Sequence, residues 1–136
     1  MTTGPLLQQR QLAGMSILLV EDNDQVRKLF TTLLTSRGAQ VVGASTAGEA
    51  IEAFESHPPA VIVCDLKLPE EDGFSVIRRI RMLEADRGGS VPAIALSGAF
   101  ARVSMEEVYE AGFQAFRWKP ITPDELASAV LEISQQ

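Results

Sequence analysis

The chain has only one cysteine and one histidine among its 136 residues, and these scarcities exclude several kinds of site. A lone Cys64 can form neither an intramolecular disulfide nor a cysteine zinc cluster, and a lone His57 cannot build a multi-histidine metal centre. Long apolar runs are also missing, since none approaches the ~20 residues needed to cross a bilayer. The first residues lack the basic head and apolar stretch of a signal peptide. We therefore expect a cytoplasmic protein with no membrane contact of its own.

Basic residues are also in short supply. Lysine and arginine number 12 against 18 acidic residues, which gives a formal net charge of −6. A protein that binds nucleic acid through its phosphates needs a basic patch, and none is evident, so no nucleic-acid partner is expected. The 46% apolar and 22% charged residues are typical of a globular domain and not of a disordered chain.

Short apolar runs alternate with segments of helical periodicity from Ser16 onward. The runs, each of strand length, are Ile17–Val20, Gln40–Ala44, Ala60–Cys64, Ala93–Leu96 and Ala115–Trp118. Strands that alternate with helices predict an α/β fold in which helices cover both faces of a parallel sheet. The first, third and fourth runs are almost wholly apolar, as central strands are. We therefore predict a flavodoxin-like, doubly wound five-stranded sheet in the order 2-1-3-4-5, in a domain at 15–136 that follows a tail or linker at 1–14.

Capping signals mark the start of several predicted helices. Thr46 with Glu49, and Thr122 with Glu125, have the spacing of a capping box. Asp72 stands before another helical segment and is predicted to cap it.

Polar residues follow four of the five predicted strands. Glu21 and Asp22 come after the first, Asp65 after the third, Ser97 after the fourth and Lys119 after the fifth. Ligands of open parallel sheets bind outside the carboxyl ends of the strands, near the point where the strand order reverses. We therefore expect these five side chains to meet at one rim of the sheet.

Three carboxylates at one rim need a cation, because unit charges ~4 Å apart repel by roughly 4 kcal/mol at an effective dielectric constant near 20. Oxygen ligands without histidine or thiolate favour a hard ion, Mg²⁺ or Mn²⁺. A metal, the Lys119 ammonium and the Ser97 hydroxyl would together hold a phosphoryl group. Asp65 is the candidate nucleophile, because its strand lies between those that carry the acids and the Ser/Lys pair.

The motifs at these strand ends resemble those of the receiver domain of two-component response regulators over Ser16–Ser134. The matching segments are ILLVEDN, VCDLKLPEEDGF, PAIALSGA and AGFQAFRWKP. The D-x-x-x-P-x-x-D-G run is the most specific of these motifs, and its fixed positions are Asp65, Pro69, Asp72 and Gly73.

The resemblance implies a phosphorelay function for the chain. Asp65 would accept a phosphoryl group from a phosphohistidine on a histidine kinase or a histidine phosphotransfer protein. Ser97 and Lys119 would bind the phosphoryl oxygens. The chain would catalyse only its own phosphorylation and dephosphorylation, so it is not expected to be a turnover enzyme.

The resemblance also implies a metal site and a switch. Asp22 would bind Mg²⁺ directly, Glu21 through water, and Lys67 through its main-chain carbonyl. Phe116 matches the aromatic residue whose rotamer is coupled to Ser97 in the family. Switching would then remodel the face built from the fourth helix, the fifth strand and the fifth helix, where a downstream protein target would bind.

Other interpretations stay open at this point. Leu12–Met15 is similar to the linker that precedes receivers in hybrid histidine kinases, so a receiver excised from a larger protein and a stand-alone regulator are both open. A receiver-like binding module that signals without phosphorylation is the main alternative. An aspartyl phosphatase would need an acid in place of Lys67, and a flavin carrier would need a phosphate-binding loop in place of the acids after the first strand. Cys64 is expected to be a core thiol, and Trp118 to pack in or beside the core.

Overall fold

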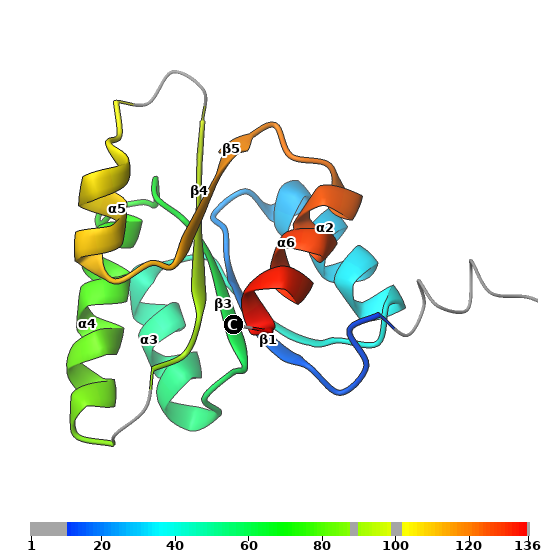
Figure 1. Cartoon of the computed structure of the whole chain (residues 1–136), viewed down its shortest axis with the longest axis horizontal. Helices are drawn as coiled ribbons and strands as arrows, with labels where there is room; N and C mark the ends of the chain where they lie inside the picture. Colours follow the sequence, from blue (N-terminus) through cyan, green and yellow to red (C-terminus); the bar gives the residue numbers. More distant parts are fainter. Residues whose placement is uncertain (1–10, 88–89, 99–101, 136) are drawn as a thin grey trace, which may run out of the picture.

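The computed structural model describes residues 11–87, 90–98 and 102–135, and they form one parallel sheet between two layers of helices (Figure 1). The strands are β1 (Ser16–Val20), β2 (Gln40–Ala44), β3 (Val61–Asp65), β4 (Ala93–Gly98) and β5 (Ala115–Lys119). Their order in the sheet is β2-β1-β3-β4-β5, and all pairs are parallel. The predicted flavodoxin-like topology is therefore confirmed.

Helices cover both faces of this sheet, as predicted. One layer consists of α2 (Asp24–Ser36) and α6 (Pro123–Ser134). The other consists of α3 (Ala47–Ser56), α4 (Gly73–Ala85) and α5 (Met105–Ala111) (Figure 1). Each layer has its own apolar core against the sheet, because strand side chains alternate between the two faces.

Four strands differ at their ends from the sequence prediction, and the first of them, β1, begins one residue earlier at Ser16. β3 begins at Val61, the first of its residues to pair with β1, opposite Ile17. β3 extends to Asp65, β4 to Gly98 and β5 to Lys119. Main-chain pairing continues beyond the apolar residues, so polar residues that were predicted to follow the strands are their last members.

The predicted caps are present, with one difference. Asp72 Oδ1 accepts the Ser75 N–H at 2.9 Å, and Thr122 and Glu125 form the complete capping box. At α3, Thr46 accepts the Glu49 N–H at 3.1 Å, but the Glu49 carboxylate accepts from the N–H and hydroxyl of Ser45 and not from the Thr46 N–H. The predicted box at Thr46 is therefore only half formed.

The segment before β1 packs closely on the domain. Leu12 is buried in the core beneath α2 and α6, and its N–H donates to the Arg37 oxygen at 2.8 Å. Gly38 has φ +98°, and a Cβ there would meet the Ala13 Cα at 2.8 Å. The described end of the predicted tail thus belongs to the packed structure. Residues 1–10 of that tail lie outside the described residues, and the boundary at 14/15 stays a prediction.

Candidate functional site

Three carboxylates and one ammonium meet at the carboxyl ends of the strands. One oxygen each from Glu21, Asp22 and Asp65 lie within 4.8 Å of one another. Lys119 Nζ donates to Glu21 Oε1 at 2.7 Å and to Asp65 Oδ2 at 2.6 Å. Glu21 and Asp65 are buried, whereas Asp22 is exposed. The structure therefore brings together the predicted acids and the predicted lysine, which are up to 98 residues apart in the sequence.

Strand register places these groups. Asp65 is the last residue of β3 and pairs with Leu96 of β4, while Lys119 is the last residue of β5 and pairs with Gly98. Ser97 is buried and lies between those two β4 residues, so it stands at the same rim, between the strands that carry Asp65 and Lys119. The rim is formed because parallel strands all end on the same side of a sheet.

The Asp65 carboxylate is held at both oxygens. The Lys67 N–H donates to Oδ1 at 3.0 Å, and Lys119 holds Oδ2. The Lys67 side chain is exposed, and the predicted role of its carbonyl as a metal ligand stays a prediction.

Gly73 closes the loop behind Asp65. Its N–H donates to the Leu66 oxygen at 2.9 Å. A Cβ at this position would lie 2.4 Å from the Asp65 carbonyl oxygen and 2.9 Å from the Leu66 Cα. Both obstacles are main-chain atoms, so only glycine fits here. In the D-G pair of the sequence motif, Asp72 therefore caps α4, and Gly73 is needed because no side chain fits at its position.

The turn after β1 is fixed by an arginine that the sequence analysis did not identify. Arg27 Nη1 donates to the Glu21 carbonyl at 2.9 Å, and Nη2 contacts Asp24 Oδ1 at 2.6 Å. The stem of Arg27 lies over Gly43, where a Cβ would meet its Cδ at 3.1 Å. An arginine three residues after an aspartate is common on helix surfaces, so spacing alone could not have indicated this role.

Burial and hydrogen bonding shift the pKa values of Glu21 and Lys119 at the site. Burial raises the pKa of the Glu21 carboxyl, against the opposing effects of the hydrogen bonds from Lys119 and the Asn23 N–H. Burial alone would lower the pKa of Lys119, but its hydrogen bonds to Asp65 and Glu21 outweigh that effect and raise it. Lys119 is therefore a firmly protonated cation between two carboxylates.

The donor set fits a hard divalent cation. It offers carboxylate oxygens and water-accessible space at Asp22, which Mg²⁺ or Mn²⁺ can complete with water. Cys64 does not compete, because it is fully buried in the core and burial raises the pKa of its thiol far above neutrality. The prediction of a core thiol is confirmed.

Two aromatic side chains lie beside the site on β5. Phe116 is buried, and its ring contacts the Trp118 ring edge-on with centroids 4.7 Å apart. Trp118 is partly exposed, so it packs beside the core and not within it. The coupling of Phe116 to Ser97 stays a prediction.

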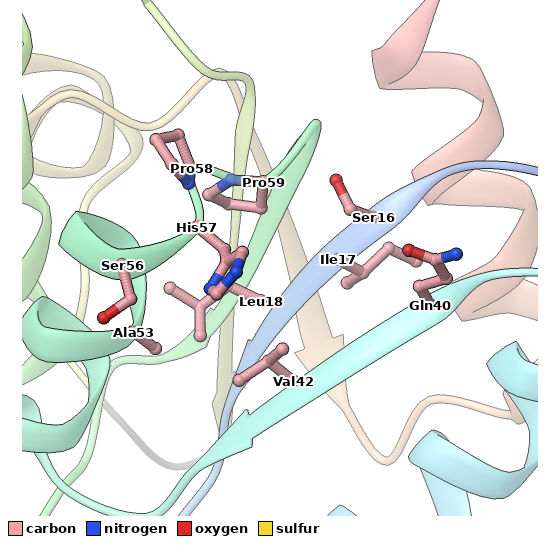
Figure 2. A pocket seen from close by; sticks show the side chains of 10 residues that line it. All are labelled: Ser16, Ile17, Leu18, Gln40, Val42, Ala53, Ser56, His57, Pro58 and Pro59. Carbon is pink, nitrogen blue, oxygen red and sulfur yellow. The ribbon is translucent and has the colours of Figure 1, made fainter.

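A separate pocket of about 490 Å³ lies at the opposite end of the strands (Figure 2). It opens between the amino-terminal ends of β1 and β2 and the end of α3, beside His57 and Pro58. Its lining includes none of the predicted site residues.

Comparison with known proteins identifies the class to which this fold and site belong. The model of the response regulator receiver domain matches residues 17–131, and the chain belongs to this family. Receiver domains are signalling modules of two-component systems that work with histidine kinases or phosphotransfer proteins and generally bind Mg²⁺ at an acidic pocket.

Relatives occur as small proteins and as parts of large ones. The chain is 37% identical over 119 residues to an uncharacterized 14.6 kDa protein in the sodA1 3′ region of Leptolyngbya boryana, covering 88% of this chain and 89% of that protein. It is 32% identical to response regulator Rre1 of Synechocystis and 30% identical to hybrid signal transduction histidine kinase D of Dictyostelium discoideum. These matches cover 85% and 92% of this chain, but only 50% and 8% of the relatives.

Solved structures agree on the fold. A CheY-like response regulator receiver domain protein from Methanospirillum hungatei superposes with a TM-score of 0.78 at 25% identity, over 89% of this chain and 94% of that one. Chemotaxis response regulator CheY4 of Vibrio cholerae gives 0.79 at 22% identity, over 88% and 98%, which supports the fold alone. No helix built from the described residues has both the length and the apolar character needed to span a membrane.

Proposed function

We propose that this chain is a phosphoacceptor in a phosphorelay, in which Asp65 receives a phosphoryl group from a phosphohistidine of a partner kinase or phosphotransfer protein. The observation that carries the proposal is the buried Asp65 carboxylate, held at one oxygen by the Lys67 N–H and at the other by Lys119. The proposed compartment is the cytoplasm, and the proposed output is the binding of a downstream protein.

The transfer step uses the Asp65 carboxylate as the nucleophile. One of its oxygens forms a bond to phosphorus while the phosphorus–nitrogen bond of the phosphohistidine breaks, and the electron pair of that bond returns to the imidazole. Lys119 exchanges its contact with Asp65 for a phosphoryl oxygen, and Ser97 donates its hydroxyl to another. Hydrolysis reverses the modification, because attack of water on phosphorus releases phosphate and restores the carboxylate.

Glu21 and Asp22, with Asp65, are the residues that would hold Mg²⁺. When bound, the ion supplies positive charge to the phosphoryl oxygens and permits two like-charged groups to approach. The arginine contact to the Glu21 carbonyl keeps the turn that carries both acids in place.

The modification adds about two negative charges and strong acceptors at the rim. Ser97 and Lys119 belong to β4 and β5, so their movement toward the phosphoryl group acts on the face formed by α5, β5 and α6. This is the face proposed to switch, with Phe116 as its buried aromatic residue.

Acetyl phosphate with Mg²⁺ tests the proposal directly. Wild-type protein should gain the mass of one phosphoryl group, and Asp65→Asn should not. Asp72→Asn is the matched control, because asparagine also caps helices well and this position should leave labelling intact. Labelling that persists in Asp65→Asn would exclude Asp65 as the acceptor, and a folded wild type that is never labelled would favour the phosphorylation-independent binding module.

A further inference from the structure

The pocket at the amino-terminal ends of β1 and β2 has a floor made by the sheet (Figure 2). Ser16 pairs with Gln40 in neighbouring strands, and Leu18 pairs with Val42. Side chains two residues apart on a strand share a face, so these four lie together on the face that α3 covers. Leu18 is 2% exposed, but Val42 is 50% exposed. The cover of α3 therefore leaves the floor open on the side of the edge strand β2.

The end of α3 and the loop after it form the wall of the pocket. Ala53 lines the wall from the last turns of the helix, and His57 caps the helix. The chain then turns through Pro58 and Pro59, which also line the pocket (Figure 2). Proline has a fixed φ and no main-chain N–H, so this part of the wall is stiff and offers no main-chain donor. The pocket is therefore preformed, as small-molecule sites usually are.

The chemistry of the lining is apolar with a few uncharged polar groups. Its volume of about 490 Å³ lies within the range of roughly 300–1,000 Å³ that is typical of small-molecule sites. No lysine, arginine, aspartate or glutamate is among the described residues that line it, and its one titratable side chain is His57. Gln40 and Ser56 add an amide and a hydroxyl at exposed positions. Ser16 Oγ accepts the Ala60 N–H at 3.0 Å, and its own hydroxyl proton can donate to a ligand.

We infer that this pocket binds an uncharged small molecule that has an apolar body and a hydrogen-bonding group such as an amide. The apolar body covers the floor at Leu18 and Val42, which removes the half-exposed valine from water. The polar group reaches the uncharged donors and acceptors at the rim. A carboxylate, a phosphate or an ammonium ion would lose water there without meeting a carboxylate, lysine or arginine among the lining residues. The inference goes beyond the proposed phosphorylation, because Asp65 lies at the other end of the strands.

Three probes of matched size test the inference: uncharged benzamide, anionic benzoate and cationic benzamidine. Each is titrated into the full chain at about pH 8, above the usual titration range of histidine, and followed by two-dimensional ¹H–¹⁵N NMR. Benzamide should shift the main-chain amide signals of Leu18, Val42 and Ala53 with a dissociation constant in the millimolar range, as expected for so small a ligand. Benzoate and benzamidine should bind at least about tenfold more weakly, because their charges find no partner in the pocket.

Variants that fill the pocket locate the binding. Val42→Phe should weaken benzamide binding at least about tenfold, and the fold should tolerate it because Val42 is half exposed and aromatic residues suit strands. Ala53→Leu fills the pocket from α3 and decides the question if Val42→Phe fails to fold. Leu29→Phe is the matched control, since Leu29 is exposed on α2 outside the lining, and it should bind benzamide like the wild type.

Three results would overturn the inference. The first is an absence of benzamide-induced shifts at the pocket residues of the wild type. The second is binding of either charged probe as strong as that of benzamide, and the third is unchanged binding by a folded pocket-filling variant. Signals of the pocket residues that move on dilution without any probe would show that a second copy of the chain occupies the pocket, and would overturn it as well.

Labelling of Asp65 by acetyl phosphate is measured on the same samples and separates the two claims. Val42→Phe should be labelled like the wild type, because Val42 lines the pocket and not the acidic site. If the wild type binds benzamide in the pocket but is never labelled, the ligand site stands and the phosphoacceptor proposal fails. If it is labelled but benzamide leaves the pocket residues unchanged, the ligand site fails and the phosphoacceptor proposal stands.

Discussion

Lys119 is the residue on which the charge balance of the site depends. Its ammonium contacts both Glu21 and Asp65, within 2.7 Å of each. A cation in this position neutralises the same carboxylates that a metal ion would need. Lys119 and Mg²⁺ therefore compete for the same carboxylates. A bound phosphoryl group would relieve this competition, because its oxygens add negative charge at the site.

Lys119→Met should strengthen Mg²⁺ binding by about tenfold, or about 1.4 kcal/mol, because it removes a competing charge and keeps an unbranched stem. Isothermal titration calorimetry of the purified chain measures this change. Lys67→Met is the matched control and should bind Mg²⁺ like the wild type, since the Lys67 side chain is exposed and only its main-chain N–H reaches Asp65. Weaker Mg²⁺ binding by Lys119→Met would contradict this account of the competition.

Residues at strand ends were predictable, and residues that act through the backbone were not. Glu21, Asp65 and Lys119 were identified because parallel topology sends the ends of alternate segments to one rim. Arg27 was not, because its role depends on a contact with a carbonyl oxygen across a turn. The steric role of Gly73 also depends on a main-chain approach that no residue pattern reports.

At the scale of elements, the loop from β3 to α4 packs directly behind Asp65. Asp72 caps the helix, and Gly73 packs directly on the main chain of Asp65 and Leu66. The sequence predicts the position of this loop from Asp72 and Gly73, but not how closely Gly73 approaches the main chain of Asp65.

Gly73→Ala should destabilise the fold by roughly 1–3 kcal/mol, because the added Cβ can be accommodated only by moving main-chain atoms. The same shift displaces Asp65, so labelling by acetyl phosphate should slow as well. Gly48→Ala in α3 is the matched control, since a Cβ there meets only Thr46 Oγ1 at 4.0 Å, and it should stabilise by roughly 0.5–1 kcal/mol. Urea unfolding gives both values, and equal stability of the two variants would refute the steric argument.

An ion pair within α4 is tied to the carboxyl end of α5 by a hydrogen bond from its arginine. Arg81 donates from Nε to the Gly112 oxygen at 3.0 Å and pairs with the buried Glu84. The other oxygen of Glu84 accepts the Val91 N–H at 2.6 Å. This cluster fixes the carboxyl end of α5 at the end of the sheet away from Asp65. The helical pattern of this segment includes Glu84, but it does not indicate that Arg81 pairs with it.

Arg81→Met should cost about 3–5 kcal/mol of unfolding free energy, because it leaves the Glu84 carboxylate buried without its cation. Arg81→Met with Glu84→Met should recover part of this loss. Arg87→Met, at an exposed arginine after the same helix, should change little. The midpoint of urea denaturation compares the three, and an Arg81→Met midpoint equal to that of Arg87→Met would show that the pair does not stabilise the fold.

At the scale of the whole molecule, the polarity of the apolar runs predicted the order of the strands. Runs without polar residues were assigned to the centre of the sheet. The fully buried β3 lies at the centre, and the polar runs β2 and β5 lie at the edges, as predicted. Residue 12 was placed outside the domain, because a single leucine between polar residues has no periodicity to indicate that it is buried. The burial of Leu12 depends on contacts with residues of α2 and α6 that are distant in the sequence, and the residues next to Leu12 in the chain give no sign of them.

The central claim is that residues from four strand ends form one centre for a divalent ion and a phosphoryl group. A crystal structure of the full chain with Mg²⁺ and beryllium trifluoride tests it most directly. We predict beryllium bonded to a carboxylate oxygen of Asp65, the metal on Asp22 and Asp65, and Lys119 and Ser97 on the fluorines. Beryllium fluoride bound to another carboxylate, or Lys119 still paired with Asp65 beside an occupied site, would contradict it.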